Sequence, residues 1–574
     1  MKQYFKTKSL WFLLLIFALF IRIMAALAWE QHFELSDYSC IENQKGIDDQ
    51  KPFFFGDSDS YWTLGRALAF SRPYQHGKEN WTIFRMPGYP LLLMPLFWFG
   101  GENPPLFWAR LENAFCGMLT VALVGCLGFL LFRDQRIALL AAFFAAVDPC
   151  SIVESILVLA EEPFVVTMLL QLICFVVLFY KIDENNGTKI LLSNKFLLRP
   201  FWSIAFWTSA LGLTSALTVY FRPDWFYFMP FVFLFMFVYL LSDQFKTSSK
   251  NRSKKRELIS SKTAQKTVFY RTNRLEPFLK SEKKGLFSVW RQIRYKRMIC
   301  VVIGATVVFW TALLPWILRN ERLTGRFIPT TLQMGASLYD GLNPNADGSS
   351  NMNFVEQFRL MEQKYPSDDP SVHFEVRLDR RFKKAAWEWI RENPQKVLEL
   401  AVIKFLRLWN FVPNEPAFSS TPIRIVLLIT YLPLLILGII GAWGTLGLRS
   451  ERPWDSVESD CQIIQPNDAQ DKNECSNLLK SSKSVFVSSE TTSGLRKAKS
   501  VAPVSFDINR FQYQGGFPYW LLWLPALYIT LLHIIFVSSI RYRTPAMFGI
   551  MILAAATIIF GVDYYRTKIL QSKQ

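Results

Sequence analysis

The sequence predicts an all-α polytopic membrane protein with about ten transmembrane helices. Of the 574 residues, 51% are hydrophobic and only 19% are charged, which is typical of a membrane protein and excludes a disordered chain or an ordinary soluble enzyme. Ten apolar runs approach the roughly 20 residues that a helix needs to cross the hydrocarbon core. The net charge of +18 could indicate either a nucleic-acid partner or cytoplasmic loops, and the position of the cations decides between them.

The predicted spans follow the apolar runs in chain order. Lys2, Lys6 and Lys8 precede the first run and place the N-terminus in the cytoplasm by the positive-inside rule. The runs lie near residues 10–29, 105–132, 137–150, 163–181, 201–221, 223–242, 299–318, 423–447, 518–539 and 545–562. Both termini are then cytoplasmic, and the outside loops are 30–88, 151–162, 319–422 and 541–543. The apolar run 89–100 is too short to span and is expected to be interfacial or re-entrant.

The cations are concentrated on the predicted cytoplasmic side. The segment 243–298 holds 17 Lys and Arg residues against four acidic residues, a net +13, without the interleaved aromatic residues or motifs of nucleic-acid-binding proteins. We therefore expect no nucleic-acid partner, and contact with anionic membrane lipid instead. The predicted organisation is an N-terminal membrane module with the first outside loop (1–242), the basic loop (243–298), helices flanking a large outside loop (299–447), a polar cytoplasmic loop (448–517) and C-terminal helices with a short tail (518–574).

Two carboxylates stand close together in the first outside loop. Asp57 and Asp59 are separated by one residue. Such a pair can accept a proton from a substrate hydroxyl or hold a divalent cation, because hard cations prefer carboxylate oxygens. Alternatively, one of the two only caps the helix expected to begin near Ser60. Spacing alone leaves these interpretations open.

Several arginines are predicted at the outer ends of spans or in outside loops. A guanidinium there can bind phosphate through paired donors, or it can extend toward lipid headgroups without a further role. Arg222 can also pair locally with Asp224. Glu161 stands just outside a span, where a carboxylate either serves a site or stays in water. The arginines in question are Arg85, Arg222, Arg319, Arg541 and Arg543.

The largest predicted outside segment is 319–422. A turn region rich in Gly, Asn and Pro is expected at 339–345, followed by helical stretches near 371–393 and 394–410 that are separated at Pro394. A loop of this size on the outer side can serve as an acceptor platform or lid, or it can be a structural cap.

Short motifs follow one another in a particular order and on particular predicted sides of the membrane. They are Gly-Asp-Ser-x-x-Tyr from Gly56, an aromatic-Arg-x-Pro-Gly-Tyr-Pro element from Phe84, the span end Asp148-Pro149, Glu161-Glu162-Pro163, the turn 218–224, the Pro-Trp-x-x-Arg-Asn element 315–320 and Arg541-Tyr542-Arg543. In this order they resemble the GT-C polyprenyl-phosphate-dependent glycosyltransferases, in particular the bacterial protein O-mannosyltransferase and aminoarabinose transferase branch.

The resemblance implies a GT-C-like bundle whose extracytoplasmic loops carry the site. In the family the catalytic acid stands four residues before the Tyr of the first motif, which corresponds here to Asp57 and Tyr61. The chain has Ser58 where the family often has Glu, and its second acid is Asp59, so Asp59 is also a catalytic candidate. A divalent cation at Asp57 and Asp59 stays open but is not favoured, and no metal site is predicted. Taken with the positions of the outer charges, the predicted substrate-binding residues are Tyr61, Arg85, Glu161, Arg222, Arg319, Arg541 and Arg543.

The function expected from the resemblance is transfer of a sugar from a polyprenyl-phosphate donor to an extracytoplasmic glycan, lipid or protein by single displacement. The expected location is a bacterial inner membrane with the active site outside. One alternative is a lipid-linked sugar flippase or transporter, which predicts inverted repeats and ionisable groups near the midplane. Another is a noncatalytic membrane scaffold, which leaves the outer acids and arginines unexplained.

Overall fold

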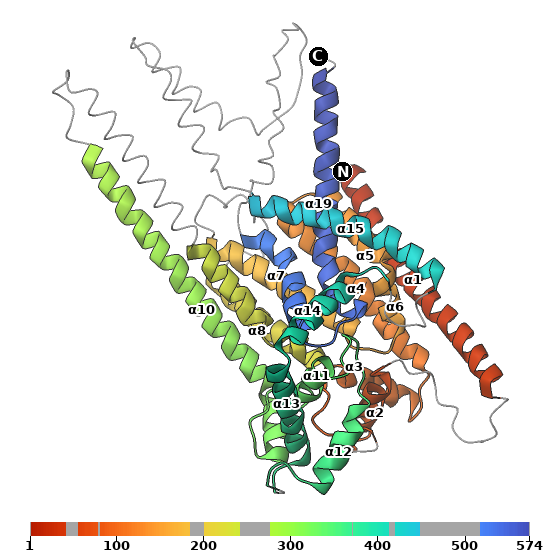
Figure 1. Ribbon diagram of the computed structural model, residues 1–574. Helices are drawn as coiled ribbons and strands as arrows, with labels where there is room; N and C mark the ends of the chain where they lie inside the picture. Colours follow the sequence, from red (N-terminus) through yellow and green to blue (C-terminus); the bar gives the residue numbers. More distant parts are fainter. Residues whose placement is uncertain are drawn as a thin grey trace, which may run out of the picture. The chain divides into compact units, whose positions relative to one another are not determined.

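The computed structural model describes residues 2–41, 56–77, 81–183, 200–241, 276–369, 371–412, 420–447 and 517–572 (Figure 1). The chain divides into two compact units, a larger one of Met1–Ala442 with Phe517–Ile559 and a smaller one of Trp443–Gly516 with Phe560–Gln574. Within the smaller unit, only the last residues of two long helices are described. The predictions for 243–275 and 448–516 fall outside the described residues and stay predictions.

Within the described residues the regular structure is helical, apart from one isolated β-bridge between His76 and Trp81. The all-α prediction is confirmed. The N-terminal helices are α1 (Lys2–Ile41), α2 (Ser58–Ala69), α3 (Gly88–Gly100), α4 (Leu106–Phe132), α5 (Gln135–Val147), α6 (Pro149–Ile156), α7 (Glu161–Asp183), α8 (Pro200–Phe221) and the 3-10 helix η3 (Pro223–Trp225). They are followed by α10 (Glu276–Thr324), α11 (Met334–Gly341), α12 (Phe354–Lys364), α13 (Phe374–Glu392), α14 (Pro394–Trp409), α15 (Thr421–Gly447), the 3-10 helix η6 (Phe517–Leu522), α18 (Leu524–His533) and α19 (Ile540–Ser572).

Two of the ten predicted spans do not form single long helices. Eight in the described part of the chain are long and apolar enough, and the bent pair α5 and α6 makes a ninth if it is one span. The ninth predicted span, 518–539, is broken into η6 and the ten-residue α18. Pro525 lies at the start of α18, and Leu521, Leu522 and Leu524 are completely buried. The protein itself covers much of this segment, which still runs from one end of the spans to the other. The Tyr519 hydroxyl donates to the Leu131 carbonyl at the end of α4, and the Ser538 N–H donates to the Gly348 carbonyl in the segment 319–422. Composition alone does not reveal the break between η6 and α18.

The spans differ in how far the protein itself covers them. In α7, 78% of the most apolar window is buried, against 17% in α1. Helix α7 packs against α4 and α8, and α8 packs against α10. Helix α7 is therefore a central helix of the larger unit, and its first residue, Glu161, is buried in the protein.

A buried arginine joins α1 to the break between α5 and α6. The α5 and α6 axes differ by 52°, and Asp148 caps α6 by accepting from the Ser151 N–H at 2.9 Å. The last carbonyls of a helix have no partner within it, and Arg22 donates to the Ala145 and Ala146 carbonyls at 3.2 and 3.3 Å. Both terminal nitrogens of Arg22 are therefore paired within the membrane-spanning part.

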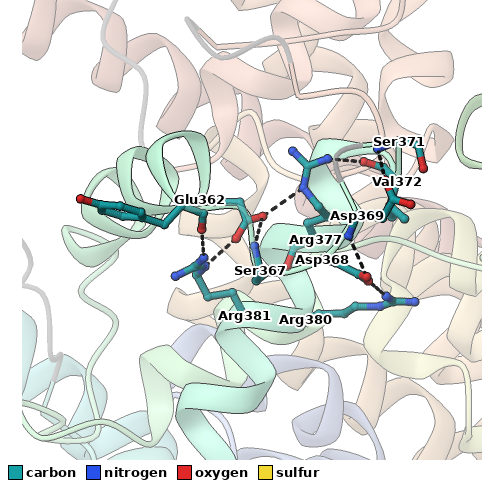
Figure 2. Close-up of polar contacts among 10 residues, drawn as sticks. Glu362, Ser367, Asp368, Asp369, Ser371, Val372, Arg377, Arg380 and Arg381 are labelled. Atoms are coloured by element: carbon teal, nitrogen blue, oxygen red, sulfur yellow. Dashed lines mark hydrogen bonds and ion pairs between the residues drawn. The ribbon is translucent and has the colours of Figure 1, made fainter.

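Helices α2, α11, α12 and α13 gather at one end of the larger unit, at the bottom of Figure 1. Both predicted helical stretches in 319–422 are confirmed as α13 and α14, which are separated at Asn393 and Pro394. Figure 2 shows how α12 is joined to α13. The completely buried carboxylate of Glu362 accepts from the Ser367 N–H at 2.9 Å and from Arg377 and Arg381 at 3.0 and 2.5 Å.

Candidate active site

Asp57 occupies the N-cap position of α2 but does not cap the helix with its side chain. The preceding Gly56 has a φ of +55°, in the left-handed region that favours glycine, and the Asp57 carboxylate makes no capping hydrogen bond. It accepts instead from Arg85 Nη2, with 2.6 Å between the nitrogen and Asp57 Oδ1. The capping interpretation therefore does not describe Asp57, whose carboxylate is directed toward a second motif 28 residues away.

Arg85 is largely enclosed by polar and aromatic groups. Its second terminal nitrogen, Nη1, donates to Gln333 Oε1 at 3.2 Å, and the guanidinium lies 5.6 Å from the Tyr61 ring centre and 5.2 Å from that of Phe84. Its side chain is 11% exposed. Because a buried charge is costly unless it is paired, the ion pair with Asp57 compensates for the burial of the Arg85 guanidinium.

Glycine allows the Arg85 loop to approach the end of α8. A Cβ on Gly88 would stand 2.4 Å from the Tyr220 carbonyl oxygen, closer than atoms can pack. The Pro-Gly of the second motif therefore lets α3 begin directly against the last turn of α8, next to Arg222.

A second group of charges surrounds Glu161 at the start of α7. Arg222 Nη1 and Arg541 Nε lie 3.8 and 3.9 Å from Glu161 Oε1. Arg222 also makes a two-point contact with Asp224, at 3.2 and 2.7 Å, which confirms the predicted local pair. Arg541 donates to the Tyr542 hydroxyl at 3.1 Å.

Arg541 joins the two groups. Its Nη1 lies 3.6 Å from the position that a Cβ would take on Gly56, so it is close to the start of α2 as well as to Glu161. We call the combined set the Asp57 cluster. It consists of three carboxylates and three guanidinium groups: Asp57, Glu161, Asp224, Arg85, Arg222 and Arg541.

The surrounding charges determine the ionisation of Asp57. Burial opposes its charged form, but Arg85, Arg541 and Arg222 outweigh burial and hold the pKa of Asp57 below its usual range. Burial raises the pKa of the nearby Tyr61 hydroxyl to about 12. At neutral pH the site therefore presents an ionised carboxylate and a protonated phenol, which can accept and donate hydrogen bonds to a substrate respectively.

Asp59 does not join the cluster. It lies in the first turn of α2 and is exposed, and two positions along a helix correspond to about 200° of rotation. Among the described residues no group of three or more His, Cys, Asp or Glu side chains could hold a metal ion. The two aspartates therefore lie on different faces of α2, and a cation at this pair stays a prediction.

The structure places Arg319 beside the cluster, in contact with backbone carbonyls. Its Nη2 donates to the Thr82 carbonyl at 3.0 Å and to the Tyr74 carbonyl at 3.4 Å. The guanidinium also lies 4.6 Å from the Trp316 ring centre, and Arg319 lines a cavity of about 440 Å³ with Tyr74 and Thr82. Its direct contacts are those of a residue that fixes the loop carrying Arg85.

Arg543 has an entirely different set of neighbours from Arg541. It is 1% exposed, donates to the Leu408 carbonyl at 3.0 Å and to that of Asn410, and lies 3.7 Å from the Tyr431 ring centre. It therefore holds the end of α14 against α15. Of the substrate-binding candidates, the structure brings Tyr61, Arg85, Glu161, Arg222 and Arg541 together with Asp57 and leaves Arg319 and Arg543 outside.

Among the residues that contact the cluster, sequence reasoning assigned no role to Gln333 or Tyr542. Gln333 accepts from Arg85, and nothing in its sequence neighbourhood indicates this contact. Tyr542 was visible between two candidate arginines, and its ring lies 4.9 Å from the Arg541 guanidinium and 5.2 Å from that of Arg222.

Several solved membrane structures are similar to this chain. The archaeal oligosaccharyltransferase AglB from Archaeoglobus fulgidus, in complex with an inhibitory peptide and a dolichol-phosphate, is 12% identical, with a TM-score of 0.47 over 100% of this chain and 52% of that one. ArnT from Cupriavidus metallidurans bound to undecaprenyl phosphate is 10% identical, with a TM-score of 0.34 over 76% of this chain and 71% of that one. The chain thus spans about half the length of the archaeal protein.

Sequence comparison identifies a family for part of the chain. No curated protein matches the sequence. Residues 97–273 match the family model described as dolichyl-phosphate-mannose-protein mannosyltransferase, and this range includes Glu161, Arg222 and Asp224 of the Asp57 cluster. The match covers 177 of the 574 residues, less than a third of the chain.

Proposed function

We propose that this protein transfers a sugar from a polyprenyl-phosphate donor to an acceptor hydroxyl by single displacement, with Asp57 as the base. The observation that carries the proposal is the Arg85–Asp57 pair, 2.6 Å long, at the point where the ends of α7, α8 and α19 meet. Proton acceptance and phosphate binding both need charged groups at one point beside the lipid.

In the proposed reaction the acceptor oxygen attacks the anomeric carbon of the sugar. Its proton passes to Asp57, and the bond between the anomeric carbon and the phosphate oxygen breaks, with the electron pair going to that oxygen. Because the pKa of Asp57 is held below its usual range, the carboxylate is ionised before the acceptor arrives. Such a weak base accepts the proton late, as the sugar–phosphate bond opens.

The leaving group requires cations. The donor phosphate is a diester with one negative charge, and the polyprenyl phosphate that leaves is a monoester that gains a second. Arg541 is the cluster arginine best placed to stabilise that charge, since its shortest ion pair, to Glu161, is 3.9 Å long. Arg85 and Arg222 are held by Asp57 and Asp224 at 2.6 and 2.7 Å.

The residues present do not fit a divalent cation at Asp57. One of its oxygens is already paired with Arg85, and Asp59 lies exposed, about 200° further around the helix. The proposed reaction therefore contains no step through a metal.

The proposed setting is the outer face of a bacterial inner membrane, with both termini in the cytoplasm. The predicted topology puts the ends of the spans at 161, 222, 319 and 541 on the same side, and Glu161, Arg222, Arg319 and Arg541 lie at one end of the larger unit. Under this arrangement α11 to α13 cover the outer face of the site, where the acceptor would arrive.

Envelope analysis tests the proposal whichever sugar is transferred. Glycans, lipids and glycoproteins from cells with and without the gene would be compared by mass spectrometry, and the deletion strain complemented with the wild type, Asp57→Asn or Asp59→Asn. We expect one sugar modification to disappear on deletion, to return with the wild type, to stay absent with Asp57→Asn at normal protein level, and to return at least in part with Asp59→Asn. Full restoration by Asp57→Asn would exclude Asp57 as the base.

The same cells provide an assay in solution. Membranes from the deletion strain contain both the donor and the unmodified acceptor, because nothing has consumed them. Purified full-length protein added to a detergent extract of these membranes should form the missing product, and its rate of formation is the turnover in this deletion-membrane assay.

A further inference from the structure

The loop that carries Arg85 is fixed by a residue almost 300 positions away. Glu375 of α13 is buried, and its carboxylate accepts hydrogen bonds from the Thr82 N–H at 2.7 Å, the Thr82 hydroxyl at 2.5 Å and the Ile83 N–H at 3.1 Å. Three donors on one carboxylate define both the position and the orientation of this backbone segment, three residues before Arg85.

Other parts of the large outside segment hold the opposite side of the loop. Arg319 donates to the Thr82 carbonyl at 3.0 Å, and the Leu332 N–H donates to the Ile83 carbonyl at 3.1 Å. The Ile83 side chain is completely buried and packs with Ile328 and Val376. Every named polar contact of Thr82 therefore goes to Glu375 or Arg319, which approach it from two elements.

We propose that Glu375 is the positioning residue of the Asp57 cluster: it fixes the Thr82–Ile83 backbone and thereby aligns Arg85 with Asp57. The inference rests on the proposed function, because it concerns the geometry of the proposed base. Glu375 itself touches neither Asp57 nor Arg85, so it acts through the loop.

Physical chemistry explains why this contact has consequences for turnover. Residues 82–85 precede α3 and have no helix of their own to fix them, so their position depends on contacts from elsewhere. A carboxylate that accepts from backbone N–H groups makes strong, charge-assisted hydrogen bonds. A displacement of about 1 Å at a reacting group can cost on the order of 100-fold in rate.

The chain contains a matched control in Glu362. It is also a buried carboxylate of the outside segment and also accepts three hydrogen bonds, from Ser367, Arg377 and Arg381 (Figure 2). These contacts join α12 to α13 and do not reach the Arg85 loop. Glu362→Gln therefore removes a buried carboxylate without removing the hydrogen bonds that fix Thr82 and Ile83.

Two measurements on the full-length protein test the inference, the first in nanodiscs and the second in detergent extract. The first is amide hydrogen exchange in peptides that cover 81–86, which reports the loop without any substrate. Glu375→Gln should speed exchange there about tenfold or more, because a neutral amide presents its own N–H groups to two backbone donors. Glu362→Gln should speed exchange at the junction of α12 and α13 and leave 81–86 unchanged.

The second measurement is turnover against pH in the deletion-membrane assay. Arg85, Arg541 and Arg222 face Asp57 with positive charge, Glu161 is the nearby carboxylate, and Tyr61 is the nearby phenol. If Arg85 moves away, the pKa of Asp57 rises, so activity should be lost at a higher pH as the medium is acidified. For Glu375→Gln we expect this shift together with a rate about 10- to 100-fold lower. Glu362→Gln should show neither.

Each outcome decides the inference. The inference would be overturned if the Glu375 and Glu362 variants had equal turnover and lost activity at the same pH. This would hold even if residues 81–86 exchanged faster in Glu375→Gln, because the loop would then not control the site. If Glu375→Gln does not fold, Thr82→Val and Thr82→Ser replace it. Thr82→Val should be several-fold slower with the same pH shift, and Thr82→Ser should match the wild type. Equal rates for the two Thr82 variants would overturn the inference. Normal turnover of Asp57→Asn would instead refute the proposed function itself.

Discussion

Arg541 and Arg543 stand two residues apart in the first turn of α19, and their different surroundings predict different consequences of mutation. Arg541 has a side chain that is 25% exposed and a shortest ion pair of 3.9 Å. Arg543 is 1% exposed and donates to two backbone carbonyls. We expect Arg541 variants to lose turnover with unchanged stability, and Arg543 variants to lose stability.

The size of the Arg541 effect follows from the charge that forms on the leaving phosphate. Removal of one preorganised donor to a developing oxyanion costs about 100- to 1,000-fold in turnover, or about 2.7–4 kcal/mol. Arg541 is partly exposed and shared with Glu161, so Arg541→Gln should fall at the lower end, about 100-fold. Arg541→Lys keeps the charge but loses paired donation, and the loss of one charge-assisted hydrogen bond corresponds to about tenfold.

The Arg543 effect follows from its carbonyl partners. Arg543→Gln leaves the Leu408 and Asn410 carbonyls without their guanidinium donor, and each unsatisfied buried group costs about 1–3 kcal/mol. The midpoint of thermal unfolding in detergent should therefore fall, while the turnover of the folded fraction changes little.

Kinetics in the deletion-membrane assay distinguish the two residues. Turnover would be measured over a dilution series of the extract, with undecaprenyl phosphate added as a product inhibitor. Arg541→Gln should lower maximal turnover by a larger factor than it raises the extract concentration that gives half-maximal turnover. It should also weaken inhibition by undecaprenyl phosphate. Wild-type turnover of both Arg541 variants would refute the assignment, as would an equal loss of turnover in Arg543→Gln with unchanged unfolding.

Three further predictions follow from the same geometry. Because the pKa of Asp57 is lowered, activity should stay constant as the pH falls from 7 to about 5 and be lost only below that, whereas Arg85→Gln should begin to lose activity at a higher pH; identical profiles would contradict the ion pair. Excess EDTA should leave turnover unchanged in the deletion-membrane assay, and an inhibition reversed by Mg²⁺ would restore the cation hypothesis. Asp57→Cys and Tyr339→Cys should react in intact cells with an impermeant thiol reagent, whereas Lys254→Cys should not, and the opposite pattern would invert the proposed topology.

The sequence predicted those features that depend on local pattern. Apolar runs identified the eight helices that are long and apolar enough to cross a membrane, and Pro394 marked the boundary between α13 and α14. The run 518–539 shows the limit of this approach, because a largely buried segment broken into a 3-10 helix and a short helix has the same apolar composition as a continuous transmembrane helix. The two differ in what surrounds them, which composition does not record.

The residues of the candidate site likewise fall into those that the sequence predicted and those that it did not. Motif order selected residues whose positions at span ends let Asp57, Arg85, Glu161, Arg222 and Arg541 meet, although no local pattern relates them to one another. Motif order failed to separate Arg541 from Arg543, because both stand in one motif and one helical turn. Gln333 and Glu375 left no sequence signal, since each contributes through a contact with a loop that lies roughly 250 to 300 residues earlier in the chain.

The charge balance of the Asp57 cluster fits the proposed order of events. The cluster contains equal numbers of carboxylate and guanidinium groups. In the proposed displacement Asp57 loses its negative charge by accepting a proton, while the leaving phosphate gains one, so the total charge in the site does not change. Negative charge therefore moves from Asp57 to the phosphate. Arg541 lies close to the start of α2 and to Glu161, where it can stabilise the negative charge both on Asp57 and on the leaving phosphate. Its removal should therefore slow the reaction more than it weakens donor binding.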